Sequence, residues 1–185
     1  LFRQSLLLEV GRVEEARAGV EAMLSQAPGN ADALALRSVI RVAQNETEPA
    51  LADGRRAVEL DPRSAPARIA LSYAQQASLQ LEAARTTMEE AVAAHPGDAL
   101  AHARLAEILL TLGYRSEAER SARRAADLAP DLGRAQTVLG FAALVRQQAG
   151  EAQATFERAV RLEPADPQPR LGLGLALIRQ GRLEA

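Results

Sequence analysis

Small residues recur along this chain at a fixed interval of 34 positions, between longer runs of mixed apolar and polar residues. One alanine set follows the interval without exception: Ala16, Ala50, Ala84, Ala118 and Ala152. A proline set keeps the same spacing: Pro28, Pro62, Pro96, Pro130 and Pro164. Helix-forming residues fill the stretches between, and a proline prevents a helix from continuing. The pattern therefore predicts a tandem repeat of two helices followed by a turn.

The repeat register follows when each of these prolines is placed at position 32. The complete repeats are then 31–64, 65–98, 99–132 and 133–166, with partial repeats at 1–30 and 167–185. We expect first helices at about 31–44, 65–78, 99–112 and 133–146, and second helices at about 49–60, 83–94, 117–128 and 151–162. No β-strand is expected, and residues 1–185 are predicted to form one array.

Other positions of the repeat indicate how the helices pack. Position 27 is alanine in every complete repeat, and position 8 is always small: Ser38, Ser72, Ala106, Gly140 and Gly174. Two helices approach to about 8 Å between their axes only where the contact residues are small. Leucine fills position 7 in four repeats. Because one helix pair cannot bury these leucines alone, the repeats are expected to stack on a shared core.

Small residues at positions 8, 20 and 27 with proline at position 32 resemble the tetratricopeptide repeat (TPR) family, over essentially the whole chain. The resemblance implies an all-α solenoid, a right-handed superhelix of antiparallel helix pairs, that acts as a protein–protein interaction scaffold. Arg37 and Arg41 depart from the family, because they stand where it has apolar residues. Either the first helix of that repeat rolls to bury Leu36, Val39 and Ile40, or the arginine stems pack while their charged ends reach water.

In this family, positions 5, 9 and 12 of the first helices line a concave groove that holds the partner. The candidate partner-binding residues on this stripe are Val39, Val42, Ile69, Tyr73, Gln76, Glu107, Leu110, Thr137, Phe141, Leu144, Leu175 and Ile178. Most are apolar, which suits an amphipathic helix or an extended apolar peptide. Tyr73 and Phe141 matter most, because aromatic residues concentrate binding energy where a partner covers them. Alternatively, part of the stripe packs against the neighbouring repeat as core.

Charge and composition narrow the class of partner. The chain has 22 basic and 24 acidic residues, a net charge of −2, so it lacks the basic footprint of a nucleic-acid-binding protein. It has no run of about 18 apolar residues, so no membrane insertion is expected. Every basic residue is an arginine. The absence of lysine argues against the carboxylate clamp with which some members of the family hold the tails of chaperones.

Residues that could carry chemistry are sparse. His95 and His102 are the only histidines and there is no cysteine, so neither a metal site nor a cofactor is expected. Gly172 and Gly174 lack the third glycine of a dinucleotide-binding loop and are predicted to be packing glycines. We therefore expect no catalytic residue and no enzyme.

Two alternatives to a partner-binding scaffold stay open: a self-association module acting through its terminal repeats, or the accessory repeat region of a larger enzyme such as a glycosyltransferase. The chain begins without methionine and stops where a second helix should start, so we expect it to be a piece of a longer protein. Leu173, Leu177 and Leu183 are then expected to leave an exposed apolar patch. Residues 165–185 also resemble the repeat region of bacterial proteins that join a FecR-like domain to TPR repeats, which implies association with the bacterial envelope. The compartments considered are the bacterial cytoplasm and periplasm.

Overall fold

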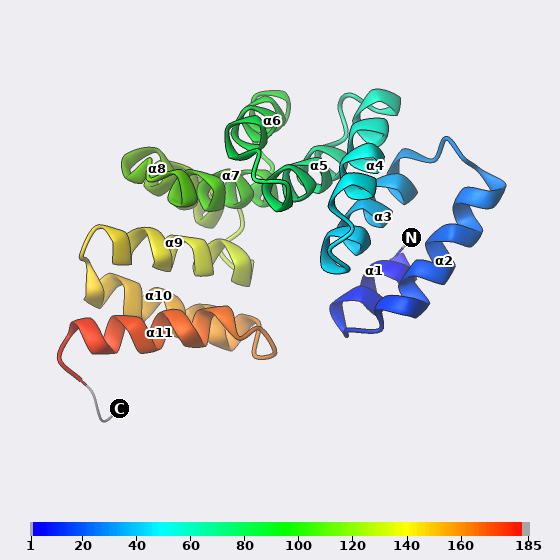
Figure 1. Ribbon diagram of the computed structural model, residues 1–185. Coiled ribbons are helices and arrows are strands. Elements are labelled where there is room, and N and C mark those ends of the chain that lie inside the picture. Colours follow the sequence, from blue (N-terminus) through cyan, green and yellow to red (C-terminus); the bar gives the residue numbers. More distant parts are fainter. Residues whose placement is uncertain (1, 183–185) are drawn as a thin grey trace. The chain divides into compact units, whose positions relative to one another are not determined.

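The computed structural model describes residues 2–182, and within them the chain is helical with no β-strand (Figure 1). The helices of this range are α1 (Phe2–Glu9), α2 (Val13–Gln26), α3 (Ala31–Ala43), α4 (Thr47–Leu60), α5 (Ala65–Ala77), α6 (Leu81–Ala94), α7 (Ala99–Leu112), α8 (Arg115–Leu128), α9 (Gly133–Val145), α10 (Ala149–Leu162) and α11 (Gln168–Arg179). None of them is long and apolar enough to cross a membrane. The predicted all-α fold class is confirmed.

The turn inside each helix pair depends on a residue in the left-handed backbone region at position 15. Three of these residues are glycines with φ of 76° to 85°, and the other three are Asn45, Leu79 and Gln147 with φ of 60° to 64°. A left-handed residue ends the first helix and reverses the chain. One further residue then suffices to start the next helix. The second helices of the complete repeats therefore begin two residues earlier than predicted.

Side-chain caps start the first helices of three repeats. Asn30, Ser64 and Asp98 each accept a hydrogen bond from the backbone N–H three residues later, at 3.0 to 3.1 Å. Such a bond satisfies an amide that the helix itself leaves unpaired. Leu132 holds the same position before α9 and makes no side-chain cap bond. The start of α9 therefore depends on its tertiary packing.

The chain divides into two compact units, Leu1–His95 and Pro96–Ala185. In the first unit, helices α2 to α5 contribute to a core that includes Val20, Leu34 and Ile40. In the second, α7, α8 and α9 share a core of alanines with Val138, and α9, α10 and α11 share one around Phe156. Helices that follow one another within a unit contact each other, as α9, α10 and α11 illustrate (Figure 1). The grouping of all the repeats into a single array stays a prediction.

Small residues make the contacts between paired helices, as the repeat pattern predicts. The position 20 alanines are completely buried in all five places, and so are the position 27 alanines of the complete repeats. Gly140 and Gly172 act in the same way, because a Cβ on either would lie closer than 3.0 Å to the Phe156 ring. Gly174 does not. A Cβ there would meet nothing within 4 Å, so its interpretation as a packing glycine is wrong.

Candidate functional site

In the first unit, the candidate partner-binding residues lie on α3 and α5, which contact each other. All five are half-buried: Val39, Val42, Ile69, Tyr73 and Gln76. Val39 and Val42 pack against the buried cores of this unit. The two valines therefore have a packing role, and none of the five presents a fully exposed side chain.

In the second unit, two candidate residues on α9 are buried. Thr137 is 4% exposed, and its hydroxyl donates a hydrogen bond to the Gly133 carbonyl at 3.0 Å. Leu144 is 6% exposed and lies in the core that α9 shares with α10 and α11. Because both side chains are buried, neither is available to a partner. Assigning both residues to the groove is therefore not supported by their positions.

Phe141 on α9 combines a core contact with partial exposure. Its ring meets that of Phe156 edge to face, with centroids 5.0 Å apart and the ring planes at 74°. Phe156 is completely buried, so Phe141 packs against a core residue although it is only half-buried itself. Leu110 on α7 is also half-buried and packs against the neighbouring core of the unit. Both residues therefore offer a partner only part of their side chain.

Glu107, the acidic member of the candidate set, lies between two arginines. Arg134 on α9 donates to both of its carboxylate oxygens, at 2.8 and 3.1 Å, and Arg104 on α7 donates to one at 2.9 Å. Burial raises the pKa of Glu107, and the charge and hydrogen bond of Arg104 oppose that rise. Burial likewise lowers the pKa of Arg104. The carboxylate therefore ties α7 to α9 and is already engaged by these two guanidinium groups.

The most exposed candidate residues lie on α11. Leu175 is 42% exposed and Ile178 is 56% exposed, and Leu171 on the same stripe is 65% exposed. Residues spaced i, i+4 and i+7 share one side of a helix. We call these three residues the α11 face. It is the part of the predicted stripe that a partner can reach most freely.

The apolar patch expected from Leu173, Leu177 and Leu183 is formed by other residues. Leu173 and Leu177 are half-buried, and Leu173 packs against the core around Phe156. Leu183 lies outside the described residues. The exposed apolar surface of α11 is therefore on a different side of the helix from the one predicted.

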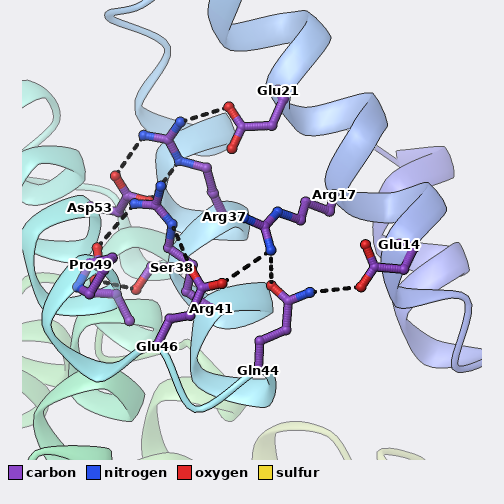
Figure 2. Close-up of polar contacts among 11 residues, drawn as sticks. Glu14, Arg17, Glu21, Arg37, Ser38, Arg41, Gln44, Glu46, Pro49 and Asp53 are labelled. Atoms are coloured by element: carbon purple, nitrogen blue, oxygen red, sulfur yellow. Dashed lines mark hydrogen bonds and ion pairs between the residues drawn. The ribbon is translucent and has the colours of Figure 1, made fainter.

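A cluster of charged residues joins α3 to α4 in the first unit. Figure 2 shows Arg37 and Arg41 of α3 meeting Asp53 of α4. Arg37 donates to both carboxylate oxygens of Asp53 at 2.7 and 2.8 Å, and Arg41 donates to one at 2.6 Å. The Asp53 side chain is only 7% exposed. Ile40 is completely buried, and Leu36 and Val39 pack against the same core, as expected from a rolled helix. The two arginines nevertheless remain in the contact between α3 and α4, where their charged ends bind Asp53.

The same cluster extends to α2 (Figure 2). Glu21 accepts a hydrogen bond from Arg37 at 3.0 Å, and Arg17 donates to Gln44 at 3.0 Å and to Glu46 at 3.1 Å. One feature of the sequence could have indicated this charged cluster. Asp53 is an acidic residue at position 23, where the other complete repeats have threonine or serine. An acid at this position, in a repeat with two arginines on its first helix, therefore suggests ion pairs between the two helices.

Comparison with known proteins agrees with this architecture. A family model described as "Tetratricopeptide repeat" matches residues 5–65, 69–133 and 137–185. The chain belongs to the tetratricopeptide repeat family. This fold is a protein–protein interaction scaffold, and TPR proteins bind protein or peptide partners.

Solved structures of TPR proteins resemble this one. TTC0263, a thermophilic TPR protein of Thermus thermophilus, is 25% identical with a TM-score of 0.86, covering 96% of this chain and 97% of that one. PilF of Pseudomonas aeruginosa is 25% identical with a TM-score of 0.71, covering 82% and 69%. YrrB, a TPR protein with an unusual peptide-binding site, is 19% identical with a TM-score of 0.60, covering 89% and 85%, and shares the fold alone. No curated protein sequence matches the chain.

The histidines of this TPR protein contact backbone. His95 Nε2 lies 2.6 Å from the Arg63 carbonyl oxygen, and His102 Nε2 lies 3.1 Å from the Pro96 carbonyl oxygen. Within residues 2–182, no group of three or more acidic, histidine or cysteine side chains is placed to hold a metal ion. TPR repeats are typically non-enzymatic scaffolds.

Proposed function

We propose that this TPR protein is a non-enzymatic scaffold that binds an apolar or amphipathic segment of a partner protein on the first helices of its second unit. The observation that carries the proposal is the α11 face, whose three aliphatic side chains are all substantially exposed. Contiguous exposed apolar residues often mark contact sites. Half-buried Phe141, on the adjacent helix α9, extends the apolar character of this region.

The geometry of α11 favours a helical partner. The apolar side chains of the α11 face recur at i, i+4 and i+7, the spacing with which one helix packs along another. Gly174 lies between Leu171 and Leu175 and has open space where a side chain would stand. A partner side chain can therefore approach the α11 backbone closely at this point. The half-buried stripe of the first unit, with Tyr73 at its centre, is a second and smaller candidate surface.

Selection of binding peptides tests the proposal. A displayed library of random peptides is panned against the full chain, and recovered peptides are titrated against the chain and a Leu175→Ala/Ile178→Ala variant. Both side chains are largely exposed, so their loss leaves the helices intact, as circular dichroism checks. We expect recovered peptides with apolar residues three and four positions apart, and affinity at least about tenfold weaker for the variant.

Leu79→Ala is the matched control, because Leu79 is 86% exposed and belongs to the first unit. It should leave the affinity unchanged. Phe141→Leu should weaken binding less than the double variant, because it keeps an apolar side chain against Phe156. Recovered peptides that bind the double variant as well as the unchanged chain would show that the α11 face is not the site.

A further inference from the structure

We infer that the partner segment carries acidic residues beside its apolar stripe, so that the α11 face selects an acidic amphipathic helix. The inference rests on the proposed function and adds the charge of the partner. Arg170 and Arg179 lie on α11 next in sequence to Leu171 and Ile178, Arg182 follows the end of the helix, and all three are exposed. Among the described residues none of the three forms an ion pair, although Arg179 also donates to the Leu144 carbonyl at 3.3 Å.

The charge on α11 itself has one sign, although Glu163 and Asp166 lie in the connection that precedes the helix. Residues 167–182 include three arginines and no aspartate or glutamate, and residues 132–148 on and around α9 include Arg134 and Arg146 and again no acid. Of the acids that act on these two arginines, Glu107 and Glu119 belong to α7 and α8, and Glu163 and Asp166 lie in the connection between α10 and α11. An incoming helix with its own carboxylates would therefore meet cations that have no competing acid on α11. Arginine is well suited to this role, because its guanidinium binds a carboxylate through two hydrogen bonds.

Arginines beside an apolar stripe are also found in helices that lie on anionic membranes. A protein segment is favoured here for two reasons. Membrane binding grows with the apolar area inserted, and this face offers three aliphatic side chains without an exposed aromatic ring on α11. In addition, the opposite side of α11 is packed on α10, with Gly172 against the Phe156 ring. The helix is thus part of a packed unit that presents a narrow stripe, which matches the width of another helix.

Three synthetic peptides of about 18 residues, long enough to populate a helix, test the inference. The first has leucines on one helical side flanked by glutamates, and the second has the same leucines flanked by lysines. The third has the composition of the first with its leucines distributed around the helix. Each is titrated against the full chain by fluorescence anisotropy. We expect the first to bind at least about tenfold more tightly than either other peptide, and its advantage over the lysine peptide to shrink as salt screens the exposed charges.

Two charge variants locate the effect. Arg170→Gln/Arg182→Gln removes two arginines beside the α11 face and should remove most of the preference for the acidic peptide. Arg120→Gln/Arg124→Gln is the matched control, because both arginines are exposed on α8 in the same unit and form no ion pair among the described residues. This control carries the same change in net charge and should keep the preference.

Equal affinity for the acidic and lysine peptides would overturn the inference while leaving the proposed function intact. Equal affinity for the peptide with distributed leucines would also overturn it, because attraction would then need no apolar stripe.

Anionic phosphatidylglycerol vesicles that bind the chain through Arg170 and Arg182, without peptide binding, would overturn the inference and identify a membrane as the occupant. Sedimentation as a dimer that Leu175→Ala dissociates would identify a second copy. If panning and all three peptides yield no binding, the proposed function fails together with the inference.

Discussion

The contact between the two helices of a repeat is built in opposite ways in the two units. In repeat 31–64 it is charged, because Arg37 at position 7 binds buried Asp53. In repeat 133–166 position 7 is Leu139, and the completely buried Phe156 fills the contact at position 24. Both repeats nevertheless form helix pairs with almost the same bounds relative to the register. The repeat therefore requires a filled contact, whatever chemistry fills it.

The comparison also shows how the repeat compensates for size. The largest residue at position 24, Phe156, lies against a glycine at position 8, Gly140, whose missing side chain makes room for the ring. Where position 24 is glycine, at Gly54, Leu71 of α5 occupies the space, and a Cβ on Gly54 would lie 3.0 Å from the Leu71 Cα. A large residue on one helix is thus matched by a small one on its partner. Single substitutions that break this match should cost stability.

Phe156→Ala has the largest expected effect. Phe156 is completely buried against Gly140, Gly172 and Phe141, so its removal leaves a cavity that two glycines cannot fill. Loss of a buried phenylalanine costs about 3–5 kcal/mol. Urea unfolding followed by circular dichroism measures it, and Phe156→Leu should cost clearly less. A loss below about 1 kcal/mol, typical of a surface substitution, would mean that the ring is not a core residue.

Asp53→Ala should cost slightly less, about 3 kcal/mol, the low end expected for breaking a buried ion pair. The substitution leaves the half-buried Arg37 and Arg41 with Glu21 and Glu46 as their remaining acidic neighbours. The same urea unfolding measures the change. Asp32→Ala is the control, since Asp32 is exposed on the same unit. A similar loss in both variants would contradict a special role for Asp53.

A triple variant sharpens this prediction. Arg37→Leu, Arg41→Leu and Asp53→Thr together give the cluster the kinds of residue that other repeats use. Replacing a buried charge cluster as a whole by residues that pack is often neutral or stabilising. We expect the triple variant to be about as stable as the unchanged chain, although Asp53→Ala alone is not. A triple variant as unstable as Asp53→Ala would mean that the charges make a net contribution of their own.

Replacing either of two glycines on α11 by alanine should change the stability by a smaller amount, with opposite signs at the two positions. Gly172→Ala drives a methyl group into the Phe156 ring and should cost about 1–3 kcal/mol. Gly174→Ala meets open space and should stabilise the helix by about 0.5–1 kcal/mol, because alanine loses less backbone freedom than glycine on folding. Thermal unfolding of the two variants measures both signs. The same sign in both would contradict the packing difference between these two positions.

The repeat itself could be read from the sequence, because a spacing repeated five times outweighs the local ambiguity of any one segment. That spacing predicts the helices and the buried alanines such as Ala118. The Asp53 cluster is harder to predict, because it depends on which face of α4 meets α3. The burial of Thr137 and Leu144 could not be predicted either. Their stripe has the same residue types whether a helix of this protein or a partner covers it, so only the tertiary packing distinguishes core residues from binding residues.

The candidate site, too, could be predicted only in part from the sequence. Periodicity placed Leu175 and Ile178 on a stripe, and that stripe is exposed on α11. The exposure itself could not be predicted, because Leu144, which holds the position of Ile178 on α9, is apolar as well and is buried. The arginines around the α11 face were visible in the sequence. Their role could be inferred only once the structure showed that they form no ion pair with the acids of residues 2–182.

The smallest expected change in stability concerns one turn position, which is leucine in the first unit and glycine in the second. Leu79 holds a left-handed φ of 60°, whereas Gly113 holds the same position in the second unit with φ of 85°. A left-handed conformation costs a residue with a side chain about 1–2 kcal/mol. Glycine gives back about 0.4–1 kcal/mol through the greater freedom of the unfolded chain. Leu79→Gly should therefore stabilise the protein by about 0.5–1 kcal/mol, since Leu79 is 86% exposed and has little packing to lose. Asn45→Gly should gain less, because asparagine tolerates this conformation, and destabilisation by Leu79→Gly would reveal a contact that offsets the strain.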